Sequence, residues 1–279
     1  MCFDISYWVI ICHVPPILIY KKKNRKNGVT KREFYTTIPM ERWQENTDSI
    51  CDVMDIHCDC SKRENHQVSY ETYHDFANKF LQKDKVTHDI FVYDEETMSA
   101  IRSLCKENLV SVNDYLTAKM FEEDKTDKII IASDLRKQLH CYSQGALGNY
   151  STAFSVRFKG KNADTVAIAG KVHKQVQKIM KTPASLYLIL QCYARLTPSL
   201  IDAAAISTLG NFDSKAGRFI GTVFFGFQNP MSYSITNLGK IESRSIDNAV
   251  FIPPASPAVK KIKGVLTVNG RMNICVCQR

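Results

Sequence analysis

The chain has 279 residues, of which 44% are hydrophobic, so it can bury a sizeable core in one large domain or two smaller ones. This composition excludes disorder as the default state. Lysine and arginine outnumber aspartate and glutamate by 37 to 28, and the resulting charge of +9 is spread along the sequence apart from a basic run at 20–26. Such a surface suits anionic small molecules, lipids, nucleic acids or acidic proteins, and only a site can choose among them.

The cysteines and the apolar opening point to a reduced, membrane-free protein. The ten cysteines are irregularly spaced and no convincing secretion signal precedes them, so we expect free thiols and a cytoplasmic location. Residues 7–20 imitate an anchor that ends in lysines, but the run is too short to span a bilayer and contains His13, Pro15 and Pro16. We therefore expect a buried element there and no membrane span.

Metal and nucleic-acid sites are not favoured. Cys51, His57, Cys58 and Cys60 crowd four soft ligands into one short segment, whereas zinc sites usually take two pairs of ligands from separate turns. We expect no metal. The aromatic residues follow core spacings and no nucleic-acid-reading module is present, so we expect no nucleic-acid partner. The sequence also lacks a phosphate-binding loop and a G-x-S-x-G nucleophile motif.

In chain order, residues 24–68 are polar and weakly periodic and read as a connector, and regular patterns begin at Ser69, a helix cap. Apolar stripes at helical spacing predict helices over 69–82, 94–108, 111–123, 163–180, 184–196 and 199–209. Alternating or β-branched runs predict strands over 87–94, 127–136, 151–158, 232–239, 248–254, 263–270 and 272–279. The Asn-Gly pair at 269–270 predicts a hairpin between the last two strands. This mixture indicates an α/β layered fold.

Four of these segments carry short motifs in a fixed order. The helix at 111–123 contains Asn-x-x-Leu-x-Ala, the next strand ends in Asp-x-Arg, a Gly-Asn turn precedes the third strand, and Ser-x-x-Asn-x-Gly follows much later. The residues concerned are Asn113, Leu116, Ala118, Asp134, Arg136, Gly148, Asn149, Ser234, Asn237 and Gly239. In this order, over 94–279, they resemble the chloramphenicol-acetyltransferase-like superfamily of CoA-dependent acyltransferases, which includes condensation domains and alcohol acetyltransferases.

The first residues resemble the end of that family's His-x-x-x-Asp-Gly signature. Asp4 matches the aspartate, Ile5 replaces the glycine, and the expected histidine would stand one position before Met1. None of the seven histidines in the sequence has an aspartate four positions later. In the family this histidine is the general base, so we expect this polypeptide to be truncated and catalytically weak or inactive.

The resemblance implies a two-layer mixed sheet with helices, like the C-terminal lobe of these enzymes. Residues 1–23 would be the stub of the first lobe, 24–68 a connector and 69–279 the C-terminal lobe, with a separate N-terminal lobe as a partner. The implied reaction moves an acyl group from a thioester of coenzyme A or an acyl carrier protein to a small alcohol or amine. A non-catalytic lobe that binds a carrier protein or a partner subunit is the alternative. We expect acetyl-CoA or another acyl thioester as co-substrate and no bound cofactor.

The resemblance also assigns roles to single residues. Asp4 would pair with Arg136 and fix the motif loop, unless Asp4 is simply solvated at a frayed end. Ser234, or its neighbour Ser232, would stabilise an oxyanion or line the acyl tunnel, unless it is only a strand-end serine. Asp134, Asn149 and Asn237 are expected to be structural or tunnel-lining, with Asn149 capping a turn.

Overall fold

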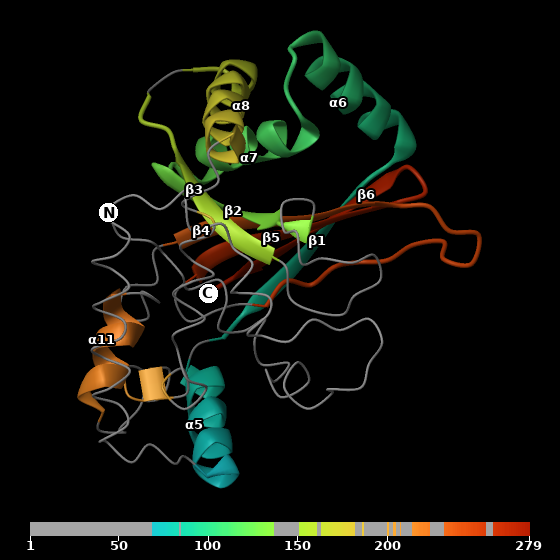
Figure 1. Ribbon diagram of the computed structural model, residues 1–279. Coiled ribbons are helices and arrows are strands. Elements are labelled where there is room, and N and C mark those ends of the chain that lie inside the picture. Colours follow the sequence, from blue (N-terminus) through green and yellow to red (C-terminus); the bar gives the residue numbers. More distant parts are fainter. Residues whose placement is uncertain are drawn as a thin grey trace.

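The computed structural model describes residues 69–83, 85–136, 151–160, 163–181, 214–223, 232–254 and 259–279, and the single positions 186, 200, 203, 204 and 207 (Figure 1). Its helices are α5 (Tyr70–Lys83), α6 (Glu95–Glu107), α7 (Val112–Asp124), α8 (Thr165–Lys181) and α11 (Lys215–Val223). Its strands are β1 (Thr87–Tyr93), β2 (Lys128–Asp134), β3 (Ser151–Arg157), β4 (Ser232–Ile241), β5 (Val259–Val268) and β6 (Arg271–Gln278).

The described strands form one mixed sheet in the order β1-β6-β5-β4-β2-β3. β4 runs parallel to both of its neighbours, β2 and β5, while the outer pairs are antiparallel. Parallel pairing requires crossover connections, here including α8, so strands and helices must alternate along the chain. The α/β mixed-sheet fold predicted from the sequence is confirmed.

Helices α6, α7 and α8 cover one face of the sheet (Figure 1). Strand residues of alternate positions meet them in a common core that includes Ile129, Ile131, Val156, Ile235 and Val265. Helical residues Met98, Leu116, Met120, Ile168 and Val172 complete it from above. Because side chains alternate along a strand, Ser232, Ser234 and Thr236 must point to the opposite face.

Local capping explains why α6 and α7 begin where the sequence predicts. The Thr97 amide donates to Asp94 Oδ1 at 2.8 Å at the start of α6. At the start of α7, Ser111 and Asp114 form a reciprocal capping box, with the Ser111 amide 2.9 Å from Asp114 Oδ2 and the Asp114 amide 3.1 Å from Ser111 Oγ. Each cap satisfies backbone donors that would otherwise lack partners.

The hairpin between β5 and β6 is also confirmed. Asn269 and Gly270 both adopt positive φ, 46° and 88°, as a two-residue turn between right-twisted strands requires. Cys275 and Cys277 lie on one face of β6 with Sγ atoms 3.8 Å apart, and both are buried free thiols, as is Cys105. Burial, and then the neighbouring Cys275, raises the pKa of Cys277 to about 12.

The predicted strand at 248–254 is wrong. This segment has no strand pairing and lies against the face of β5 and β6 that is opposite the helices. Asn273 Nδ2 donates to the Ala249 carbonyl at 2.9 Å, and the Cys277 thiol donates to the Pro253 carbonyl at 3.4 Å. Pro253 and Pro254 lack amide donors, which explains why an apolar run of this kind does not join a sheet.

Helix α11 was not predicted, and it begins with Ser214 Oγ accepting the Gly217 amide at 2.8 Å. The predicted helices at 184–196 and 199–209 fall almost entirely outside the described residues, as do residues 1–68 with Asp4 and the Cys51–Cys60 cluster. None of the helices in the described ranges combines the length and apolarity needed to cross a membrane. In the same ranges, no three potential ligands gather as a metal site would require.

Candidate functional site

Ser234 lies in the middle of the sheet, on the strand that both neighbours flank in parallel. Its Cα partners are Ile130 on β2 and Ile262 on β5. The side chain is 0% exposed, and its hydroxyl has no hydrogen-bond partner in the described part of the chain. A buried polar group without a partner is costly, so such a group either meets an unseen partner or is kept for a ligand.

The neighbouring hydroxyls extend this feature into a row, which we call the β4 hydroxyl row: Ser232, Ser234 and Thr236. All three are buried and share the sheet face opposite α6, α7 and α8. Thr236 Oγ1, like Ser234 Oγ, finds no partner among the described residues. The row is therefore a line of hydroxyl donors inside the protein, on the face that the helical core does not use.

Asp134 is the last residue of β2, and Arg136 lies two residues beyond it. Ile130 pairs with Ser234, so alternation places Asp134 on the face of the β4 hydroxyl row, four residues and about 13 Å further along β2. Arg136 Nε donates to both Asp134 carboxylate oxygens, at 2.9 and 2.8 Å, and the two side chains are about half exposed. The pair thus forms a local turn at the end of β2. The hypothesised Asp4 partner lies outside the described residues, and so does Asn149.

Asn237 lies on the other face of β4. Its Cα partner is Val265, a residue of the helix-covered core. Asn237 Oδ1 accepts the Gly239 amide at 2.8 Å, and Gly239 has a φ of 85°, which favours glycine. The strand shifts register here and continues to Ile241, so Asn237 shapes a bulge within β4 instead of joining Ser234 at one site.

The sequence did not predict a second polar cluster, between α7 and α8. His173 Nδ1 lies 2.8 Å from Asp114 Oδ2, with the carboxylate side chain only 3% exposed and the histidine 32% exposed. Burial, assisted by the nearby negative Asp114, raises the pKa of the Cys105 thiol. The only sequence signal for this cluster was the Ser111 and Asp114 capping pattern, which predicts a helix start and no more.

No protein-family model matches the chain, and no curated protein sequence matches it. Among solved structures, the epimerization domain from the third module of tyrocidine synthetase B aligns with a TM-score of 0.45 and 10% identity, over 99% of this chain and 61% of that chain. F. sporotrichioides TRI101, complexed with coenzyme A and T-2, aligns with a TM-score of 0.41 and 13% identity, over 70% and 47%. The wax ester synthase/diacylglycerol acyltransferase from Marinobacter aquaeolei VT8 gives 0.38 and 10%, over 75% and 50%.

The solved structures that align with this chain include condensation-type domains, nonribosomal peptide synthetases and acyltransferases. The chain spans only 47% to 61% of the three structures described above. At such low identities and TM-scores, the likeness describes an arrangement of strands and helices and assigns no activity to this chain.

Proposed function

We propose that this chain is an acyltransferase lobe whose β4 hydroxyl row receives the thioester of an acyl donor. The acyl group would pass from coenzyme A or an acyl carrier protein to a small alcohol or amine, in the cytoplasm. The observation that carries this proposal is the Ser234 hydroxyl at the centre of the sheet, which is fully buried and has no partner among the residues that the structure describes, on a residue of the family-like Ser-x-x-Asn-x-Gly motif.

The chemistry asks for a donor at this kind of position. When the acceptor oxygen or nitrogen bonds to the thioester carbon, the carbonyl oxygen gains negative charge. As the carbon–sulfur bond then breaks, the thiolate leaves and takes up the acceptor's proton. The Ser234 hydroxyl would donate to the carbonyl oxygen while it is negative. Donors of this kind contribute about 10²- to 10³-fold to the rate in water-excluded sites.

The second requirement is a base. In the resembling family the motif histidine removes the proton from the acceptor, and such a base supplies about 10²- to 10⁴-fold. No histidine of the printed sequence occupies the motif position relative to Asp4. We therefore expect slow transfer or none without an added base, and we expect Asp4 to pair with Arg136 and hold the motif loop.

A rescue experiment tests both requirements. Release of free thiol from acetyl-CoA is followed in the presence of small alcohols and amines, with and without added imidazole as a replacement base. We expect imidazole to accelerate protein-dependent transfer, and Ser234→Ala to lower the rescued rate by about 10²-fold. Ser155→Ala is the matched control. Ser155 pairs with Ile130 across β3 and β2, so it lies on the sheet face of Ser234, but it is exposed to solvent. Its replacement should leave the rate unchanged.

Three outcomes contradict parts of the proposal. Robust turnover without imidazole would overturn the expected need for an external base. Equal rescued rates for the parent protein and Ser234→Ala would remove Ser234 from the reaction. Binding of an acyl carrier protein without rescue by imidazole would favour the alternative, a non-catalytic lobe that holds a carrier protein or partner subunit.

A further inference from the structure

Strand β1 is an edge of the described sheet, and it carries large apolar side chains in solvent. It pairs with β6 on one side, and no other described strand lies beside it (Figure 1). Ile90, Phe91 and Val92 are 51%, 53% and 58% exposed. Proteins usually protect an edge strand with lysine, proline or a bulge, but residues 87–93 contain no lysine or proline and pair with β6 in one regular register. The edge of β1 is therefore open to pairing with a further strand.

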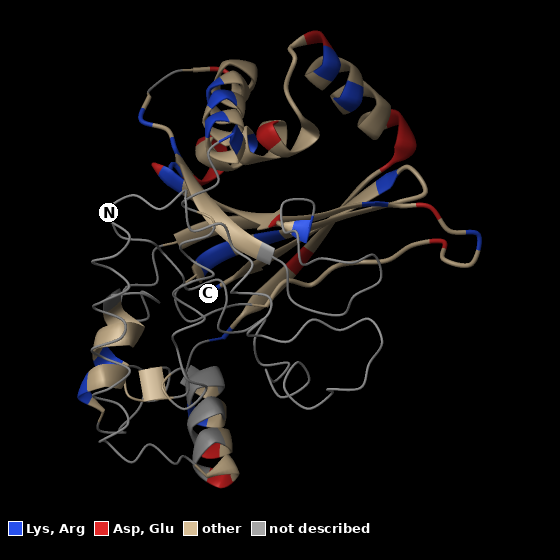
Figure 2. Ribbon diagram, in the orientation of Figure 1, with Lys and Arg blue, Asp and Glu red and all other residues tan. Residues whose placement is uncertain are grey.

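The charges around β1 are separated along its length. Lys85 and His88 lie at its start, and Asp94, Glu95 and Glu96 follow its end; all five are exposed. Figure 2 shows this polarity, with basic ribbon just before β1 and acidic ribbon where α6 begins. An antiparallel copy of the same segment would place each end beside the opposite charge, whereas a parallel copy would bring like charges together. The charge pattern therefore favours an antiparallel second copy.

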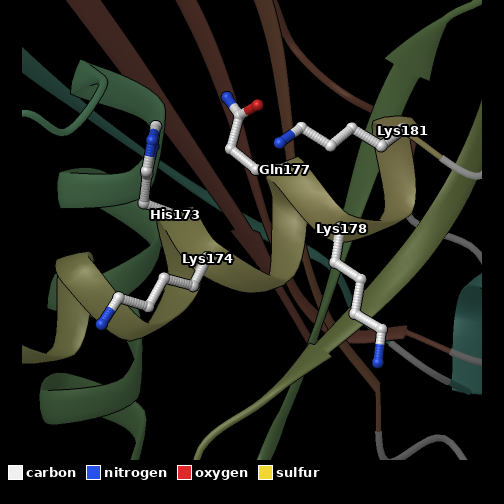
Figure 3. A pocket seen from close by; sticks show the side chains of 5 residues that line it. All are labelled: His173, Lys174, Gln177, Lys178 and Lys181. Atoms are coloured by element: carbon white, nitrogen blue, oxygen red, sulfur yellow. The ribbon is translucent and has the colours of Figure 1, made fainter.

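The outer face of α8 offers no such surface to a second copy. The helix has no aspartate or glutamate, so two copies that met there would bring like charges together. Figure 3 shows Lys174 and Lys178 pointing away from His173, Gln177 and Lys181. These side chains therefore do not converge on one group of a partner, and the basic face does not compete with β1.

The charge of Asp89 limits the register of an antiparallel pair. A two-fold axis perpendicular to the sheet keeps each face beside the same face of the copy, so the axis must pass through a residue position. An axis through Asp89 itself would set two carboxylates directly opposite each other, and an axis through Ile90 would make them diagonal neighbours. An axis through Val92 would set Asp89 opposite Glu95 of the copy. Each of these registers places like charges close together.

We propose that β1 binds a second copy of this chain by antiparallel pairing about a two-fold axis at Phe91. In this register the two Phe91 rings meet, Ile90 lies opposite Val92 of the copy, and His88 lies opposite Asp94 of the copy. The two sheets then form one continuous sheet. One strand of seven residues buries less surface than an obligate interface, so we expect a reversible dimer. The proposal stands independently of the acyltransferase proposal, because it uses no residue of the β4 hydroxyl row.

Sedimentation velocity of the full chain over a range of concentrations measures the dimer Kd. Phe91→Lys removes the aromatic pair and sets two like charges at the axis, so we expect it to raise this Kd about tenfold or more. Leu238→Lys is the matched control, because Leu238 is 55% exposed on the inner strand β4, and it should change the Kd less than about twofold. Both replaced side chains are more than half exposed, so both variants should keep the melting temperature of the parent.

Cross-linking tests the register. Opposite residues of antiparallel strands have Cβ atoms about 4.5–5.5 Å apart, so Phe91→Cys should form a covalent dimer under mild oxidation. Thr87→Cys is the control: the two Thr87 positions would lie eight residues apart along the pair, about 27 Å, so this variant should cross-link no more than the parent.

Three results overturn the proposal. A parent protein that stays monomeric into the millimolar range would favour a strand of a different protein as the occupant of this edge. A dimer whose Kd is unchanged by Phe91→Lys, or is raised equally by Leu238→Lys, would place the contact elsewhere. Equal cross-linking of Phe91→Cys and Thr87→Cys would contradict the two-fold axis at Phe91.

Discussion

Replacing Ser234 with alanine should stabilise the protein. The residue is 0% exposed and its hydroxyl has no hydrogen-bond partner in the described ranges. Keeping such a hydroxyl away from water costs about 1–3 kcal/mol. Removing one oxygen leaves a very small void, which at about 24 cal/mol per Å³ offsets only a few tenths of a kcal/mol. We therefore expect Ser234→Ala to raise the free energy of unfolding by about 1 kcal/mol.

Urea unfolding followed by circular dichroism measures this difference, provided that the denaturant slope is unchanged. Ser214→Ala is the opposite control, because Ser214 is 1% exposed and its hydroxyl accepts the Gly217 amide at 2.8 Å at the start of α11. The Ser214→Ala variant should lower the free energy of unfolding by about 1 kcal/mol. If Ser234→Ala also lowers the free energy of unfolding by about 1 kcal/mol or more, the Ser234 hydroxyl has a structural partner, and the reasoning that it is kept for a ligand is refuted.

Three further predictions concern the sheet. Lys261→Met should lower the free energy of unfolding by about 2–3 kcal/mol in urea, since Lys261 Nζ lies 2.5 Å from Asp124 Oδ1 and that carboxylate side chain is only 4% exposed. Adding Asp124→Asn to Lys261→Met should restore part of the lost free energy of unfolding. If it restores none, the loss does not come from an uncompensated charge on the buried Asp124 carboxylate. Gly264→Ala should lower the free energy of unfolding by about 1–3 kcal/mol, because the new Cβ would lie 2.5 Å from Pro253 Cδ. An unchanged melting temperature would show that the segment at 248–254 does not pack closely against β5. The free energy of unfolding should fall above pH 9, because folding raises the pKa of the Cys277 thiol from 9.0 to about 12. The stabilising contribution of the neutral thiol is complete below pH 9 and is lost as the pH rises through the folded-state pKa of about 12. The loss is at most about 1.4 kcal/mol per pH unit, and Cys277→Ala should flatten the urea-measured pH profile; an identical profile for this variant would contradict the assignment.

The elements that the sequence predicted well are those whose signals are local. Asp94 and Ser111 cap α6 and α7 through residues three positions away, and the Asn269–Gly270 turn specifies its own hairpin. The alternation of β4 likewise follows from its own residues. For these segments, neighbouring residues determine the structure, and the rest of the fold only has to agree with it.

The features that the sequence missed depend on distant residues. His173 and Asp114 are 59 positions apart, and only the packing of α8 on α7 brings them together. The segment at 248–254 has strand-like composition, but its polar contacts are made with side chains of β6, not with a neighbouring backbone. Helix α11 is short and contains two glycines, so its pattern gave no helical signal. Of the expected site residues, Ser232, Ser234 and Asp134 share a sheet face in the described part, and Arg136 lies just beyond the end of β2.

Isotope-edited infrared spectroscopy of bound acetyl-CoA, labelled with ¹³C at the thioester carbonyl, tests the central claim most directly. If the Ser234 hydroxyl donates to the carbonyl oxygen, the stretching frequency of the bound thioester falls below its value in solution. The shift should disappear in Ser234→Ala and persist in Ser155→Ala. Acetyl-CoA that binds the parent protein with an unshifted carbonyl, or that keeps its shift in Ser234→Ala, would contradict the account.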